Sequence, residues 1–292
     1  MVCFGPSVIA DIDNPAATST RALLGALTAA NHQVSHLERR GNALLDRQLR
    51  SRGSIALRAV NARYPDVRVR QHDLPLGAQN RGVWFGTEVS TADAVVAFPG
   101  TPDDILDLIA RFETPHLVRL VPAGAQGDLT VDVTNVVEPR SHTADTGDIL
   151  VVAYDNVEDT WVDAVPDDLV RLVVGATDLP GWAYLPEVEL AERYRSARVA
   201  LVLGAGENHE SLSRLLLPIA AGCSAVAQLP LDGHPQTTLR YVDPPNIATA
   251  LRDPYLDTPA PLLPEHDASL VAADLVATIR RTLVEKRSRT RT

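Results

Sequence analysis

The stretch ADAVVAFPG, from Ala92 to Gly100, gives the clearest indication of the fold class of this chain. Its apolar run has the length and composition of a buried strand, and Thr101 and Pro102 after it are typical of a helix N-cap and a first helical position. Asp103 and Asp104 then lie where the positive end of a helix favours carboxylates. A buried strand that leads directly into a helix is the repeating unit of a parallel sheet covered by helices.

Similar strand and helix patterns occur on both sides of this stretch. In the first half, a helix is predicted from Asn14 and Pro15 to Asn31, a strand at 34–38, and a further helix within the arginine-rich segment 39–63. In the second half, strands are predicted at 148–154, 169–175, 199–204 and 224–228, and helices at 187–196 and 211–222. The sequence therefore predicts an α/β fold with parallel sheets.

The polar, turn-rich stretch RSHTADTGD, residues 140–148, lies near the middle of the chain. We place the domain boundary there, which gives an N-terminal domain over 1–145 and a C-terminal domain over 146–266. Residues 267–292 are predicted to form a C-terminal helix with a basic tail. This helix could pack back on the N-terminal domain.

Composition excludes several functional classes. The net charge of -10 disfavours a broad nucleic-acid-binding surface, and because Lys286 is the only lysine, Schiff-base and P-loop mechanisms are disfavoured too. No apolar run reaches the roughly 18 residues of a membrane span, and the first residues do not resemble a secretory signal, so we expect a cytoplasmic protein. Cys3 and Cys223 lie far apart in apolar stretches and are predicted to be buried free thiols.

The segment GAGENHESLSRLLLPIAAG, from Gly204 to Gly222, carries the clearest ligand-binding pattern. A polar loop leads from a strand end to a helix start, where free backbone N–H groups can receive an anion. Ser211, Ser213 and Arg214 would add directed donors there, which suits a diphosphate. The alternative is an ordinary serine N-cap with the arginine on a solvated helix face.

Three segments resemble GT-B glycosyltransferases, especially the spore-maturation-protein-like group. LPEVELAERYRSARVALVLG (185–204) and SRLLLPIAAGCSAVAQLP (213–230) are similar to the tyrosine-bearing helix, strand and arginine-led helix of the C-terminal domain in that group. NPAATSTRALLGALTAANHQVSHLER (14–39) resembles its first loop, helix and second strand. The resemblance covers less than half of the chain.

This resemblance implies two Rossmann-like domains facing a cleft, with a nucleotide-diphosphate sugar on the C-terminal domain and the acceptor on the N-terminal domain. It implies that Arg214 and the helix start at 211–213 meet the diphosphate, and that Leu185 and Pro186 lie near the base. The predicted donor-binding set is Arg214, Ser211, Ser213, Gly204, Glu207, Glu210 and Leu185.

Two positions depart from the group's pattern. The helix normally carries a glutamate that can bind ribose hydroxyls where this chain has Leu217, and the first loop commonly carries a histidine where this chain has Ala16. Asp11 or Asp13 could take the place of that histidine as the catalytic base, since a carboxylate at a strand end can accept a proton. The alternative is that these aspartates are turn or capping residues.

The loop after the strand at 199–204 contains the other candidates. Glu207, His209 and Glu210 would follow a strand end, where a base or a ribose-binding acid is useful, and His209 is the catalytic candidate among them. The alternative is a solvated polar loop. Histidines and acids show no metal-binding spacing, so no metal and no cofactor are predicted.

Three functions remain open from the sequence. The leading hypothesis is a metal-independent transfer of a sugar from a nucleotide-diphosphate sugar to an unknown acceptor, with Arg214 offsetting charge on the leaving diphosphate. The second is a non-catalytic subunit of the same fold that acts with a partner protein, which Leu217 and Ala16 favour. The third is epimerisation or hydrolysis of a nucleotide sugar.

Overall fold

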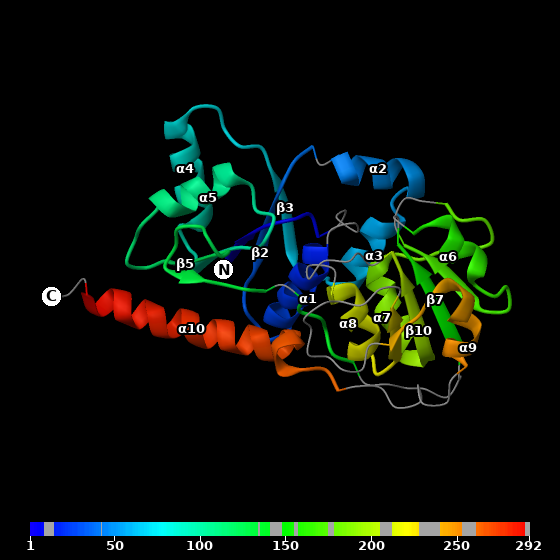
Figure 1. Ribbon diagram of the computed structural model, residues 1–292. Coiled ribbons are helices and arrows are strands. Elements are labelled where there is room, and N and C mark those ends of the chain that lie inside the picture. Colours follow the sequence, from blue (N-terminus) through cyan, green and yellow to red (C-terminus); the bar gives the residue numbers. More distant parts are fainter. Residues whose placement is uncertain are drawn as a thin grey trace.

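The computed structural model describes residues 1–8, 15–41, 43–133, 135–140, 148–154, 157–174, 178–204, 212–227, 240–252 and 261–289. Its described strands form two parallel sheets, each with helices on both faces (Figure 1). This arrangement confirms the predicted α/β class and is compatible with two Rossmann-like domains. The boundary predicted at 140–148 stays a prediction, and its residues 141–147 lie outside the described ranges.

The first sheet has the strand order β3-β2-β1-β4-β5-β6, and neighbouring strands pair in parallel. Its strands are β1 (Val2–Phe4), β2 (Ser35–Arg39), β3 (Arg68–His72), β4 (Ala94–Ala97), β5 (Val118–Val121) and β6 (Leu129–Thr130). The connecting helices are α1 (Pro15–Ala29), α2 (Ala43–Arg52), α3 (Ile55–Arg63), α4 (Ala78–Val89) and α5 (Asp103–Arg111). Because the strands run parallel, their carboxyl ends lie along one edge of the sheet.

The second sheet repeats this topology, with the order β12-β11-β10-β7-β8-β9. Its strands are β7 (Asp148–Ala153), β8 (Val170–Val173), β9 (Ala183–Tyr184), β10 (Ala197–Leu203), β11 (Ser224–Ala227) and β12 (Arg240–Tyr241). Its helices are α6 (Asp159–Ala164), α7 (Glu187–Ser196), α8 (Leu212–Ala220) and α9 (Ile247–Leu251). In both sheets the strand order reverses between two central neighbours, β1 and β4 in the first and β10 and β7 in the second.

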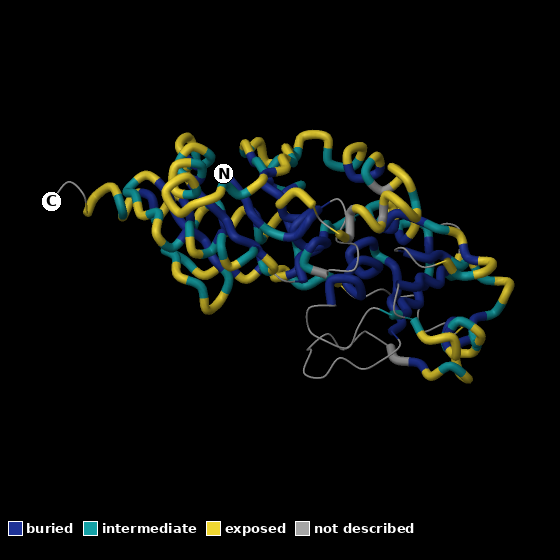
Figure 2. The backbone as a smooth tube through the Cα atoms, turned by 90° about the horizontal axis from the view of Figure 1, so that it is seen from above, coloured by how far each residue is buried: buried dark blue, intermediate teal, exposed yellow. Residues whose placement is uncertain are grey.

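The hydrophobic cores follow the two-residue period of the strands. In β4, Val95 and Ala97 face the core formed with α4 and α5, whereas Ala94 and Val96 face the core formed with α1 and α10. Figure 2 shows buried backbone through the interior of both halves, with exposed segments outside. Cys3 and Cys223 are buried free thiols, as predicted, and burial raises the pKa of each to about 12.

The structure corrects the predicted start of α5. The hydroxyl of Thr101 donates to the backbone oxygens of Phe4 and Phe98, at 3.0 and 2.7 Å, so it ties this turn to β1 and does not cap the helix. Pro102 is the N-cap, and α5 begins one residue later than predicted. The arginine-rich segment also holds two helices, α2 and α3, since the chain turns at Gly53 with φ of 60°.

The last helix, α10 (Ala268–Arg289), runs back along the first sheet, beside α1 and β5 (Figure 1). Its apolar face enters the core of the first sheet through Ala272, Leu275, Ile279 and Leu283. The first strand, β1, and the last helix, α10, therefore both belong to the half formed by the first sheet. Among the described residues, no helix combines the length and the apolar character that a bilayer crossing requires.

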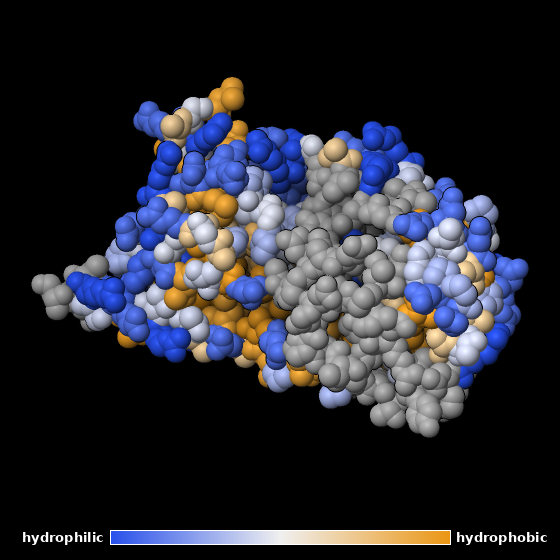
Figure 3. Space-filling view, in the orientation of Figure 1, coloured by the Kyte–Doolittle hydropathy of each residue, from blue (hydrophilic) through white to orange (hydrophobic). Residues whose placement is uncertain are grey.

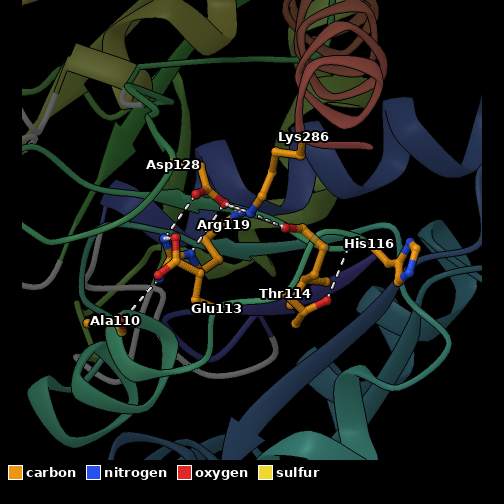
Figure 4. Close-up of polar contacts among 8 residues, drawn as sticks. Ala110, Glu113, Thr114, His116, Arg119, Asp128 and Lys286 are labelled. Atoms are coloured by element: carbon orange, nitrogen blue, oxygen red, sulfur yellow. Dashed lines mark hydrogen bonds and ion pairs between the residues drawn. The ribbon is translucent and has the colours of Figure 1, made fainter. Parts of the chain in front are cut away.

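A partly buried ion cluster fixes the far end of α10 (Figure 4). Lys286 donates to a carboxylate oxygen of Asp128 at 2.8 Å and to the backbone oxygen of Leu117 at 2.9 Å. Arg119 donates to the same carboxylate from its guanidinium, at 2.9 and 3.2 Å, and from its backbone N–H. Burial opposes ionisation of Asp128, but these hydrogen bonds outweigh it and lower its pKa to about 2.

We expect Asp128→Asn to lower the stability of the fold and to weaken its acid dependence. The folded-state pKa lies below the ordinary value, so the ionised carboxylate stabilises the protein above about pH 4, and this contribution is lost as the pH falls towards 2. Urea unfolding between pH 7 and 2.5 measures it. Asp107→Asn, at an exposed position on α5, is the control. Equal pH dependence in Asp128→Asn and the unmodified protein would contradict this role.

In Figure 3 the described residues present hydrophilic surface towards the ends of the view, whereas hydrophobic residues are visible between the helices of the first sheet and α10 and at the tip beside the start of α4. At this tip, Leu76 and Val83 are 86% and 66% exposed. Single exposed apolar residues are common on monomeric proteins, so we assign this tip no role.

Candidate functional site

The second sheet presents its strand ends at the junction between the two halves. Tyr154 directly follows β7 and Gly204 directly follows β10, and these two strands are the neighbours between which the strand order reverses. Open α/β sheets bind ligands outside the carboxyl ends of their strands at such a point. The residues there come from α1, α7 and α8, which pack together in this region (Figure 1).

Arg214 lies in the first turn of α8 and faces this point. Its guanidinium carbon is 4.2 Å from the centre of the Tyr154 ring, and the residue is only 4% exposed. A cation over the face of a tyrosine is attracted by the ring quadrupole, more strongly when both are desolvated. The stacking therefore orients the guanidinium at the strand ends, which contradicts the alternative that Arg214 lies on a solvated helix face.

Ser213 is fully buried, and its backbone N–H is already engaged. It donates to the side-chain oxygen of Asn135 at 3.0 Å. Asn135 has a φ of 60°, a conformation that asparagine tolerates better than most residues, and it belongs to the segment that joins the two sheets. One of the free N–H groups predicted for an anion at the start of α8 is therefore capped by this asparagine.

A buried ion pair joins α1 to α7. Arg21 donates to one carboxylate oxygen of Glu187 at 2.5 Å, and the hydroxyl of Thr18 donates to the other at 2.7 Å. The side chains of Arg21 and Glu187 are 4% and 2% exposed. Arg21 also donates to the backbone oxygen of Val8 at 3.2 Å. The pair thus links the two sheets through charged groups that have been removed from water.

Tyr154 and Tyr194 lie beside this ion pair with buried hydroxyls that have no hydrogen-bond partner in the described part of the chain. Burial raises the pKa of both phenols. For Tyr154, Glu187 raises the pKa further, whereas Arg214 and Arg21 lower it. These charged groups are therefore close enough to Tyr154 to form one electrostatic cluster, in which both phenols stay neutral at physiological pH.

The other predicted donor-binding residues within the described ranges, Gly204 and Leu185, contribute to the fold itself. Gly204 has a φ of 67°, which only glycine adopts without strain as the chain leaves β10. Leu185 packs in the core of the second sheet, in the same apolar cluster as Tyr154. Leu217, at the position of the expected glutamate, belongs to this cluster too, with 9% exposure.

The remaining predictions lie outside the described residues, so they stay predictions. They are the catalytic candidates Asp11, Asp13 and His209 and the donor-binding candidates Glu207, Glu210 and Ser211. Within the described ranges, His, Cys, Asp and Glu side chains form no group that could hold a metal ion.

Sequence reasoning missed Arg21, Thr18, Glu187 and Tyr154. Glu187 follows Pro186 at the start of a helix, where a carboxylate is explained by the helix dipole alone. Its partner Arg21 lies 166 residues away in the sequence, and no local pattern indicates such a pairing. A buried arginine within the largely apolar run of α1 was the available signal, because arginine is seldom buried without a partner.

No known protein-family model matches this chain, and a search among curated proteins finds no match to it.

Proposed function

We propose that this protein is a GT-B-like glycosyltransferase that binds a nucleotide-diphosphate sugar at the strand ends of the second sheet and transfers the sugar to an acceptor. The observation that carries the proposal is Arg214, held over Tyr154 at the point where the strand order reverses. Two sheets of the same doubly wound order, whose halves meet through contacts of α1 with α8 and of α3 with α7, support the GT-B arrangement.

The proposed task of Arg214 is electrostatic. A nucleotide-diphosphate sugar carries its negative charge on the diphosphate, and more charge develops there as the bond to the sugar breaks. A buried guanidinium that is already oriented stabilises such charge without reorganising, and in a water-poor site its effect is larger than at the surface. Arginine also binds phosphate oxygens in a bidentate manner, which lysine cannot do.

A non-catalytic subunit of the same fold is the second candidate, and Leu217 favours it. The side chain packs in the apolar core of the second sheet, so this position offers no acceptor for ribose hydroxyls. Binding a nucleotide sugar would then depend on other groups, and the strand ends of the second sheet would serve a partner protein instead.

A thermal-shift screen against UDP, GDP, ADP, TDP and their common sugar conjugates tests the proposal. A ligand that binds only the folded state at about 100 times its Kd adds about 2.7 kcal/mol, which for a chain of this size corresponds to a rise in Tm of roughly 4 °C. We expect one nucleotide to produce this rise. The shift should be lost in Arg214→Ala and reduced in Arg214→Lys.

The control variant is Arg252→Ala, because Arg252 lies at the exposed end of α9 in the same half of the chain. It should keep the full nucleotide shift. A full shift in Arg214→Ala would refute the role of Arg214. The absence of a shift with every nucleotide would favour the non-catalytic subunit, and co-purification of a partner protein would then be the next experiment.

A further inference from the structure

The first sheet has a pocket of its own, of about 250 Å³, at the carboxyl ends of β1, β2 and β3 and the start of α5. Phe4, Leu37 and Ile105 contribute apolar side chains to its lining. It lies beside the reversal of strand order between β1 and β4, the position at which doubly wound sheets bind ligands. No residue predicted from the sequence to bind a ligand lines it.

His72, the last residue of β3, lines this pocket with an imidazole that makes no hydrogen bond to the described protein. The residue is 8% exposed, and its Nδ1 is buried without a partner. The ring packs on Trp84, with 4.8 Å between ring centres, and meets Phe4 edge to face. Because a buried polar group without a partner is costly, a native structure that keeps one needs an explanation, and a ligand is one.

The other buried polar side chains of the pocket wall are engaged. Ser7 donates to Glu38 at 2.9 Å, and the backbone N–H of Val8 donates to the same carboxylate at 2.7 Å. At the rim, Arg39 and Arg40 form ion pairs with Asp104 and Asp73, respectively. These contacts leave the His72 imidazole as the group positioned to bind an incoming polar atom.

The size and polarity of the pocket select a ligand class. A volume of about 250 Å³ lies below the range of drug-sized sites, which suits a molecule of a single ring. A sugar ring would bring several hydroxyls, and each one without a partner would cost free energy on burial. An aromatic ring with one hydroxyl matches both the apolar lining and the single available imidazole.

We propose that this pocket binds a small phenol, whose hydroxyl donates a hydrogen bond to the His72 imidazole and whose ring packs against Phe4, Leu37 and Ile105. The binding site is inferred from this pocket alone, whereas its role as the acceptor site of a sugar transfer rests on the proposed function.

The charges around His72 keep its imidazole neutral and able to accept this hydrogen bond. Burial lowers its pKa, and Arg39 on β2 lowers it further. Asp73 beside it, Glu88 on α4 and Asp104 on α5 raise it, but by less. At pH 7 the ring therefore carries one proton and one free acceptor nitrogen.

The experiment compares two ligands that differ by one hydroxyl, p-cresol and toluene, by calorimetric titration without any nucleotide. We expect p-cresol to bind more tightly than toluene by about 3- to 10-fold, the usual effect of one neutral hydrogen bond. In His72→Leu, which keeps an apolar side chain in this place, the preference should disappear. His116→Leu, at an exposed position, is the control and should keep it.

Equal affinity for the two ligands, no binding of either, or a preference that survives His72→Leu would overturn the proposal, as would tight binding of glucose at this pocket. If His72→Leu does not fold, NMR of histidine nitrogens in the unmodified protein decides. One imidazole should then shift with p-cresol and not with toluene, and the absence of such a shift would overturn the proposal.

The outcome separates this site from the proposed function. Nucleotide binding without p-cresol binding would leave the glycosyltransferase proposal intact and refute the phenol site. Binding of p-cresol without any nucleotide shift would establish the pocket and refute the transfer reaction.

Discussion

Glu187→Ala is expected to destabilise the protein by about 3–5 kcal/mol, since it leaves the Arg21 guanidinium buried without its carboxylate. Thr18 loses its acceptor in the same variant. Urea unfolding at pH 7 measures the loss. Glu189→Ala is the matched control, because Glu189 lies on the same turn of α7 and is exposed, and its effect should stay within about 0.5 kcal/mol.

A double variant separates the net contribution of the Arg21–Glu187 ion pair to stability from the cost of leaving one buried charge unpaired. Arg21→Met with Glu187→Leu replaces both charges by apolar side chains of similar size, and it should be less destabilised than Glu187→Ala alone. If the stability loss of the double variant instead equals the sum of the losses of Arg21→Met and Glu187→Leu measured separately, the two residues act independently and the pair does not couple the two halves.

Ile279→Ala is expected to cost about 2–5 kcal/mol, the usual range for emptying a buried aliphatic site. Ile279 is 5% exposed and fills the core of the first sheet from α10, although it lies near the end of the chain. Denaturant unfolding is again the measurement, and Val284→Ala on the same helix, at 68% exposure, is the control. Equal effects of the two changes would mean that α10 is not part of this core.

Local sequence signals predicted several elements well. The first helix begins at Pro15, as expected from a proline at a first helical position, and α7 spans Glu187–Ser196, as predicted. The apolar runs at 94–97 and 197–203 are strands because each is buried on both faces of a parallel sheet.

The sequence did not predict β3, and the reason lies in its composition. RVRQH, residues 68–72, has no apolar run, because an edge strand keeps most of its side chains in water. His72 therefore had no local pattern to mark it, and only the packing of Trp84 and Phe4 places its ring at the pocket.

Local patterns were sufficient to predict the α/β class and the succession of strands and helices, because apolar periodicity, prolines and glycines act over a few residues. The start of α8 close to Arg214 also followed from the sequence, since a strand end leading into a helix is a local pattern. Three contacts could be found only in the folded chain: Thr101 binds β1, Asn135 caps α8, and Glu187 pairs with Arg21. These contacts join residues 78 to 166 positions apart, and each offsets the cost of burying a polar or charged group. That cost depends on the packing of the folded chain, which no local pattern encodes.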